Sequence, residues 1–110
     1  MFNQVNSPFD NLQNEIAKEK FAALRRISEH LASSLRELHA MHEEIEEATR
    51  REIPFHEINR MIEAFNRLRE DAEEWRYYFI VTREASGYFR GNLDASVYKI
   101  PPRKALIRNP

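Results

Sequence analysis

The chain has 110 residues; 32% of them are charged, only two are glycine, and the formal net charge at pH 7 is -1. A chain this short forms at most one domain and buries a smaller share of its surface than a larger protein does, so a core that encloses a substrate is not expected. Cysteine is absent, which excludes disulfides, thiolate catalysis and cysteine-ligated metal sites in this sequence. It shows no basic cluster followed by an apolar run at the start and no apolar window of roughly 18 residues. We therefore expect a soluble, cytoplasmic protein that makes no membrane contact.

Residues 1–7 are expected to be a flexible amino terminus, and a long helix is predicted over residues 8–52. Ser7 can cap this helix, and Pro8 suits its first position because an N–H there would have no partner within the helix. Apolar residues then recur at the spacing of a helix that packs along one side. They are Leu24, Ile27, Leu31, Leu38, Met41, Ile45 and Ala48, with Ser34 as the one polar interruption.

Pro54 separates this segment from a second one, because proline lacks the amide donor and disfavours helical geometry at Ile53. We therefore predict a second helix over residues 54–86 and a tight antiparallel hairpin. A kinked continuous rod is the alternative, since no glycine lies at the junction. Gly87 suits the position just past the helix end. The seam residues of the second helix repeat every seven residues and are Ile58, Met61, Phe65, Leu68, Ala72, Trp75, Phe79 and Thr82.

One stretch of the second helix is ambiguous. From Trp75 to Val81 the side chains are aromatic or β-branched on every face, which is typical of a buried strand as well as of a buried helix. We predict helix here. The alternative is a β-hairpin between Trp75–Arg83 and a strand after Gly87.

Residues 87–110 form a third part, a tail with aromatic residues and prolines. It carries five basic residues against one acid, so the tail is net positive and the preceding residues are net negative. Its apolar residues are too numerous for a free linker, because disordered segments are usually poor in aromatics. We therefore expect the tail to dock. Since the first helix is the longer one, its overhanging start with Phe9, Leu12 and Ile16 is the predicted docking place, within one chain or across a dimer.

No residue pattern indicates a catalytic or cofactor site. His39 and His42 lie one turn apart, with Glu43 and Glu46 four residues after each, but the Glu-x-x-His pairs of a di-metal bundle are missing. Serines and threonines lack a patterned histidine and acid, and two glycines cannot build a phosphate-binding loop. The acidic run around Glu46 is interpreted as a solvated face that pairs with Arg50 one turn later. We therefore expect no enzyme activity, no cofactor and no bound metal.

The predicted fold class is all-α: a long antiparallel helical hairpin over residues 8–86 that dimerises into a four-helix bundle, followed by an extended tail. One hairpin exposes half of its wide apolar stripe, and small cores usually need oligomerisation. The predicted function is that of a non-enzymatic interaction protein, namely a homodimeric scaffold, adaptor or small chaperone that also meets a partner protein through its tail.

Two other functions remain open at this point. The first alternative is a nucleic-acid-associated protein, because basic and aromatic residues alternate in the tail. The second is a metal-binding helical-bundle enzyme. The residues expected to form subunit or partner contacts are Leu24, Leu31, Leu38, Ile45, Phe65, Trp75, Tyr78, Phe79, Tyr88, Phe89, Tyr98, Arg103 and Lys104.

Overall fold

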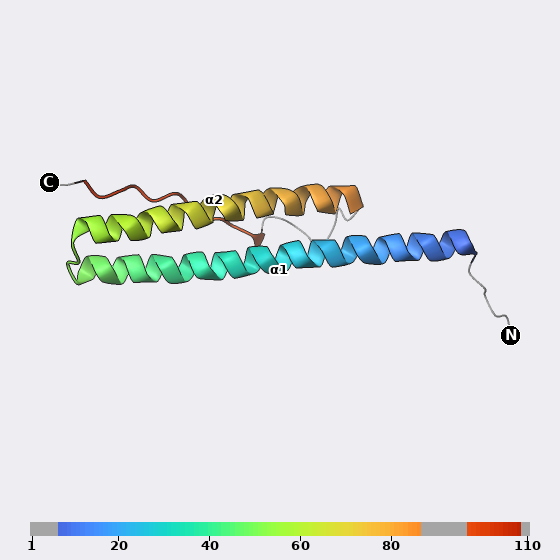
Figure 1. The fold of residues 1–110 in the computed structure, drawn as a ribbon, viewed down its shortest axis with the longest axis horizontal. Helices are drawn as coiled ribbons and strands as arrows, with labels where there is room; N and C mark the ends of the chain where they lie inside the picture. Colours follow the sequence, from blue (N-terminus) through green and yellow to red (C-terminus); the bar gives the residue numbers. More distant parts are fainter. Residues whose placement is uncertain (1–6, 87–96, 109–110) are drawn as a thin grey trace.

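The computed structural model describes residues 7–86 and 97–108. It contains two long helices, α1 (Pro8–Arg50) and α2 (Phe55–Ser86), which run side by side in opposite directions (Figure 1). The described residues contain no strand. The predicted all-α class, the helical hairpin and the helical state of Trp75–Val81 are therefore confirmed.

The start of α1 has the cap that the sequence predicts. The Ser7 side chain accepts a hydrogen bond from the Asp10 amide at 3.1 Å, and Pro8 occupies the first helical position. The Asp10 carboxylate lies in the first turn, where it faces the positive end of the helix dipole. Residues 1–6, which include most of the predicted flexible terminus, lie outside the described residues.

The turn between the helices is tight, and α1 ends two residues earlier than predicted. The amides of Glu52 and Ile53 donate to the carbonyls of Thr49 and Ala48 at 3.2 and 3.1 Å. Together they form a Schellman motif, the standard helix stop that glycine usually provides. Glu52 takes the left-handed position with a φ of 55°. A non-glycine residue can therefore end this helix, which explains how the hairpin forms without glycine at the junction.

The core lies along the contact between the two helices. Its fully buried residues repeat every seven positions on both helices, as the seam pattern predicts. They are Leu24, Leu31, Leu38 and Ile45 on α1, and Ile58, Phe65, Ala72 and Phe79 on α2, with Ala48 and Ile62 beside them. A second row is only partly buried and consists of Ile27, Met41, Met61, Leu68 and Trp75.

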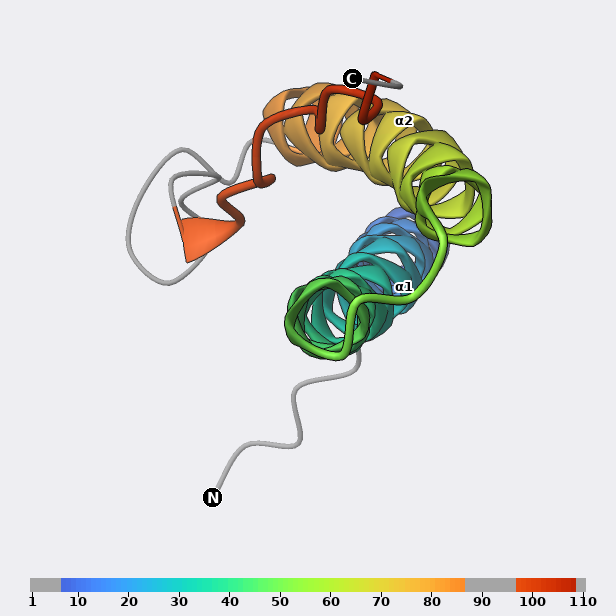
Figure 2. The same cartoon turned by 90° about the vertical axis from the view of Figure 1, so that its left-hand side faces the viewer.

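The described part of the tail, residues 97–108, is extended and runs back along α2 toward the turn (Figure 2). Tyr98 and Ile100 pack against the core. The prediction that the tail docks is therefore right, but the predicted place is wrong for these residues. Phe9, Leu12 and Ile16 remain 66%, 58% and 40% exposed. The physical reason is a set of polar side chains on α2, described below, that bind the tail backbone nearer the turn.

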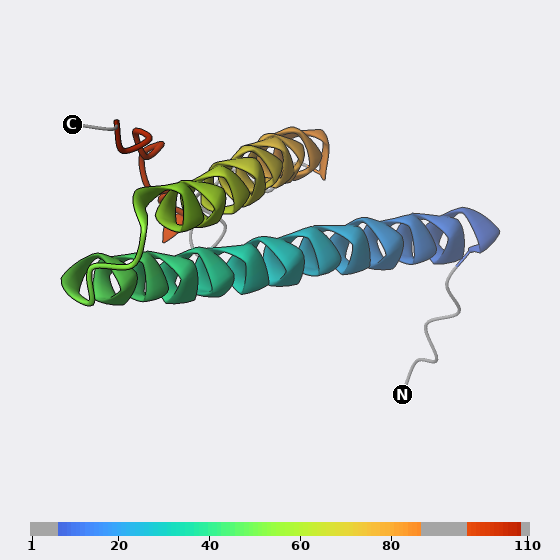
Figure 3. The same ribbon diagram turned by 60° about the vertical axis from the view of Figure 1, so that its left-hand side comes forward.

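The molecule is elongated, with principal extents of 78 × 22 × 20 Å. α1 has 43 residues and α2 has 32, so α1 extends past the end of α2 (Figure 3). The extra eleven residues correspond to about 16 Å of helix. We call this end of the hairpin, where α1 begins and α2 ends, the open end.

Candidate interaction surfaces

Two asparagines of α2 hold the tail by its backbone. Asn66 donates to the Lys104 carbonyl and accepts from the Lys104 amide, both at 2.9 Å. Asn59 does the same with Ile107, at 2.8 and 2.7 Å. A carboxamide offers one donor and one acceptor side by side, so it can pair with a main chain as a neighbouring strand would. Asn66 is buried, and its pairing satisfies a polar group that would otherwise be costly inside the protein.

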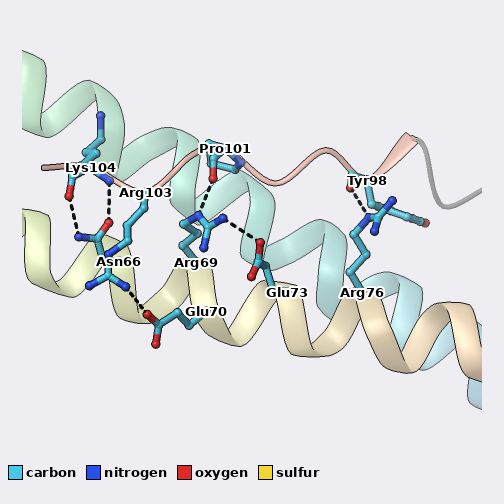
Figure 4. Close-up of polar contacts among 9 residues, drawn as sticks. All are labelled: Asn66, Arg69, Glu70, Glu73, Arg76, Tyr98, Pro101, Arg103 and Lys104. Carbon is cyan, nitrogen blue, oxygen red and sulfur yellow. Dashed lines mark hydrogen bonds and ion pairs between the residues drawn. The ribbon is translucent and has the colours of Figure 1, made fainter.

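Two arginines of α2 continue this arrangement toward the open end. Arg76 donates through Nε to the Tyr98 carbonyl at 3.0 Å, and Arg69 donates through Nε to the Pro101 carbonyl at 2.8 Å (Figure 4). Glu73 orients Arg69 through a 2.8 Å ion pair. Arginine has donors only, which suits a proline that has a carbonyl and no N–H.

The spacing of these contacts matches the helix to the tail. Every third tail carbonyl is bound, and the α2 residues come in two pairs that are seven positions apart. From Asn59 to Arg76 the helix advances 17 residues, or about 25 Å, and from Tyr98 to Ile107 the tail advances nine residues, or about 28 Å at the rise of a polyproline II segment. The two stretches are therefore nearly equal in length, although the middle step on α2, from Asn66 to Arg69, is only three residues. We call the four residues Asn59, Asn66, Arg69 and Arg76 the tail-binding face.

The tail also contacts α1, so it lies in a groove between the two helices. The hydroxyls of Tyr98 and Ser28 are hydrogen-bonded, and the Tyr98 ring lies edge-on to Phe79 with centroids 5.1 Å apart. Lys104 Nζ lies 2.7 Å from His42 Nδ1 and 5.0 Å from the centre of the Phe65 ring. The Lys104 side chain is therefore held between the two helices, and the tail closes the core on this side.

A second surface lies at the open end. It consists of large apolar side chains that remain exposed on both helices, and we call it the open-end patch. Its members are Phe9, Leu12, Ile16 and Phe21 on α1 and Tyr77, Tyr78 and Val81 on α2.

Two members of the open-end patch, Phe9 and Ile16, belong to a row on α1 that leads along the side of the hairpin away from the tail. Phe9, Ile16, Ala23 and His30 are seven residues apart, so they form one row on α1. The His30 ring lies 4.1 Å from the Trp75 ring, measured between centroids. The row thus leads to the partly buried second row of the core. A shallow hollow at this point is lined by Ala23, Arg26, Ile27, His30 and Trp75.

The predicted contact residues fall into three groups. Leu24, Leu31, Leu38, Ile45, Phe65 and Phe79 are at most 5% exposed and lie in the core of a single chain. Trp75 and Tyr78 lie near the open end on α2, and Tyr98, Arg103 and Lys104 belong to the docked tail. Tyr88 and Phe89 lie outside the described residues. The six core residues are buried within this chain, because the opposite helix and the tail already cover them.

The tail-binding face was not predicted from the sequence. Its signal was present as Asn59 and Asn66, seven residues apart, and Arg69 and Arg76, also seven residues apart. The matching tail residues, Tyr98, Pro101, Lys104 and Ile107, recur every third position. The tail lacks the P-x-x-P spacing by which polyproline segments are usually recognised.

The predicted ion pair of Glu46 with Arg50 is replaced by one between Glu47 and Arg50, at 2.7 Å. His42 Nε2 lies 4.0 Å from Glu46, while its other nitrogen faces Lys104.

Over residues 7–86 and 97–108, no group of three or more histidine, aspartate or glutamate side chains is placed to hold a metal ion. Neither described helix is long and apolar enough to cross a membrane.

Comparison with protein-family models, curated proteins and solved structures finds no match to this chain.

Proposed function

We propose that the protein is a non-enzymatic interaction protein whose working form is a homodimer. Two hairpins pack side by side into a four-helix bundle, which serves as a scaffold or adaptor for a protein partner. The observation that carries the proposal is the open-end patch.

Soluble monomers rarely expose large contiguous apolar patches, and such patches usually mark interaction sites. In this chain Phe9 and Ile16 of the patch lie in one row with Ala23 and His30, and the His30 ring contacts the partly buried Trp75. A partner that covers this row would therefore also cover the partly buried residues beside Trp75. This alignment distinguishes the row from single apolar residues scattered on a surface.

A second copy of the chain suits this surface best. The overhang of α1 carries Phe9, Leu12 and Ile16, which stay 66%, 58% and 40% exposed in the single chain. A two-fold axis along the hairpin places the overhang of a second copy at the same level, so equivalent apolar residues meet. Closed two-fold dimers with self-complementary surfaces are the commonest oligomers of soluble proteins.

The described part of the tail adds no support to the nucleic-acid alternative. Lys104 is engaged by His42 and Phe65, and Arg103 Nη1 lies 2.6 Å from Glu70 Oε1. Phosphate binding depends on cations that are free to replace counterions. Two of the tail's basic residues are instead directed at the chain itself.

The dimer is tested by absolute mass from light scattering over a wide range of concentrations. We expect twice the chain mass of 13.2 kDa for the unaltered protein. The double variant Phe9→Ser, Ile16→Ser should dissociate at a concentration at least about tenfold higher, because each exposed apolar side chain buried on association contributes on the order of 1–3 kcal/mol.

The matched control is Glu15→Ser, which alters the same overhang at an exposed charged position. It should leave dissociation unchanged. A monomer at every concentration, or equal dissociation of the patch variant and the control, would refute the proposal.

A further inference from the structure

A pocket of about 570 Å³ lies between α1 and the docked tail, and pockets of this size commonly hold small molecules. The α1 residues that line it share one face of the helix, because they are spaced by three, four and seven positions. They are Leu35, Leu38, His39 and His42. Phe65 of α2 also lines the pocket, and residues 99 and 101–104 of the tail form its other side. A single chain therefore supplies these sides of the pocket, which we call the tail pocket.

The tail pocket has an apolar base and a basic rim. Leu38 and Phe65 are at most 1% exposed, so core side chains form the base. The rim includes Lys99, Arg103 and Lys104, and no aspartate or glutamate is among the described residues that line the pocket. Arg103 is paired with a carboxylate of α2 outside the pocket, which leaves the two lysines. The pocket is therefore complementary to a ligand with an apolar body and a negative charge.

Lys104 is a cation whose described partners are uncharged. Its main chain pairs with Asn66, while its side chain extends away from Asn66 (Figure 4). The ammonium Nζ lies 2.7 Å from His42 Nδ1 and 5.0 Å from the centre of the Phe65 ring. Because an ammonium only donates, His42 accepts this hydrogen bond as a neutral ring.

The charge of Lys104 is not balanced within the described part of the chain. No carboxylate of residues 7–86 or 97–108 forms an ion pair with it. Charges withdrawn from water are usually paired with an opposite charge, and Lys104 is partly buried. The ammonium has three donors, and His42 uses one of them. Lys104 is therefore able to donate to an anion that enters the tail pocket.

We propose that the tail pocket binds a small organic carboxylate with an apolar chain or ring. The carboxylate accepts a charge-assisted hydrogen bond from Lys104 Nζ, and the apolar body covers Leu35 and the base of the pocket, which removes apolar surface from water. The place of Lys104 between the helices suits a small anion better than a polyanion at the surface. The inference goes beyond the proposed homodimer and does not depend on it, because the lining residues belong to one chain.

The probe is octanoate, titrated into the unaltered chain by calorimetry while the leucine methyl resonances are followed by NMR. We expect saturable binding and shifts at Leu35. Octanol has the same chain without the charge and should bind at least about tenfold more weakly, because hydrogen bonds to charged groups contribute more than neutral ones. Acetate has the charge without the chain and should also bind at least about tenfold more weakly. Equal affinities for octanoate and octanol, or shifts confined to Leu12 in the open-end patch, would overturn the proposal.

Lys104→Gln tests the residue that holds the charge. It should weaken octanoate binding at least about tenfold and leave octanol binding unchanged, since the main-chain bonds to Asn66 remain. Arg108→Gln is the matched control, because it removes a positive charge from an exposed tail residue that does not line the pocket. Octanoate should bind this control as it binds the unaltered chain, and equal binding by the two variants contradicts the assignment.

The carboxamide resonances of Asn66 report whether the tail stays docked in each variant. If the tail leaves in Lys104→Gln, the comparison of octanoate with octanol in the unaltered chain decides the question, because it requires no substitution. A preference for octanoate of at least about tenfold, with shifts at Leu35, then supports the pocket. No such preference refutes it.

Discussion

Asn66 shows how a single polar residue fixes the position of an entire segment. It lies on a helix, it is buried, and its carboxamide nitrogen donates to the carbonyl of Lys104 while its carboxamide oxygen accepts from the amide of Lys104. Replacing it with alanine would leave the amide and carbonyl of Lys104 without their partner. Truncation of one partner in a buried hydrogen bond usually costs about 1–3 kcal/mol.

We therefore expect Asn66→Ala to lower the free energy of unfolding by about 1–3 kcal/mol in chemical denaturation. Asn14→Ala is the matched control, since it makes the same change in helix propensity at an exposed site on α1 and should stay within about 0.5 kcal/mol. Equal effects of the two substitutions would mean that the tail contact contributes nothing measurable to stability.

Tyr78 provides a prediction that depends on pH. Its hydroxyl donates to the Glu74 carboxylate at 2.9 Å, and this hydrogen bond, with the negative charge of Glu74, raises the pKa of Tyr78 above its usual value of 10.0. Because the folded state favours the neutral phenol, the stabilisation is fully present below the unfolded pKa. It is lost as the pH rises through the folded pKa.

In an NMR titration of the Tyr78 ring carbon, we expect the midpoint to fall toward the usual tyrosine pKa in Glu74→Gln, because the charge and the strong acceptor are both lost. Glu63→Gln removes an exposed carboxylate elsewhere on α2 and should leave the midpoint in place. An unchanged midpoint in Glu74→Gln would show that Glu74 does not perturb Tyr78.

At the scale of the elements, the end of α1 contains an unfavourable residue choice. Glu52 occupies a left-handed conformation with a φ of 55°, which costs a residue with a Cβ about 1–2 kcal/mol. Glycine adopts this conformation readily and is the usual residue at this position of a Schellman motif. Glu52→Gly should therefore raise the free energy of unfolding by about 1 kcal/mol.

Glu44→Gly is the contrast, since Glu44 is exposed inside α1 and glycine there should cost about 1 kcal/mol. Denaturation of the two variants side by side measures both effects. If Glu52→Gly destabilises the protein as Glu44→Gly does, the turn does not require the left-handed conformation.

The elements could be predicted from the sequence to the extent that local patterns control them. The seven-residue repeat of apolar residues identified both helices, and it also resolved Trp75–Val81, where Phe79 is fully buried and Tyr77 is exposed as on a helix. The end of α1 was predicted two residues too late, because a glutamate in a position that glycine usually occupies gives no sequence signal.

The position of the tail was not predicted, for a different reason. Helix lengths indicate where uncovered surface lies, but the tail is held by side-chain bonds to its backbone, and these depend on matching repeats in two distant segments.

The elongated shape of the molecule makes it possible to distinguish the proposed side-by-side dimer from an end-to-end dimer. A single chain is 78 Å long and about 20 Å across. Two hairpins that pack side by side about a two-fold axis along their length double the mass while the longest dimension stays near that of one chain. If the hairpins instead met end to end, overlapping only through the overhangs of about 16 Å, the assembly would reach about 140 Å.

Small-angle X-ray scattering at concentrations where light scattering finds a dimer distinguishes these shapes. We expect a maximum dimension close to that of the monomer and an increase in the radius of gyration of the cross-section. This arrangement follows from the apolar row that runs from Phe9 to His30 and onward to Trp75, because only lengthwise contact covers all of it. An assembly much longer than one chain would confine the contact to the open end, leave the row uncovered, and refute the side-by-side bundle.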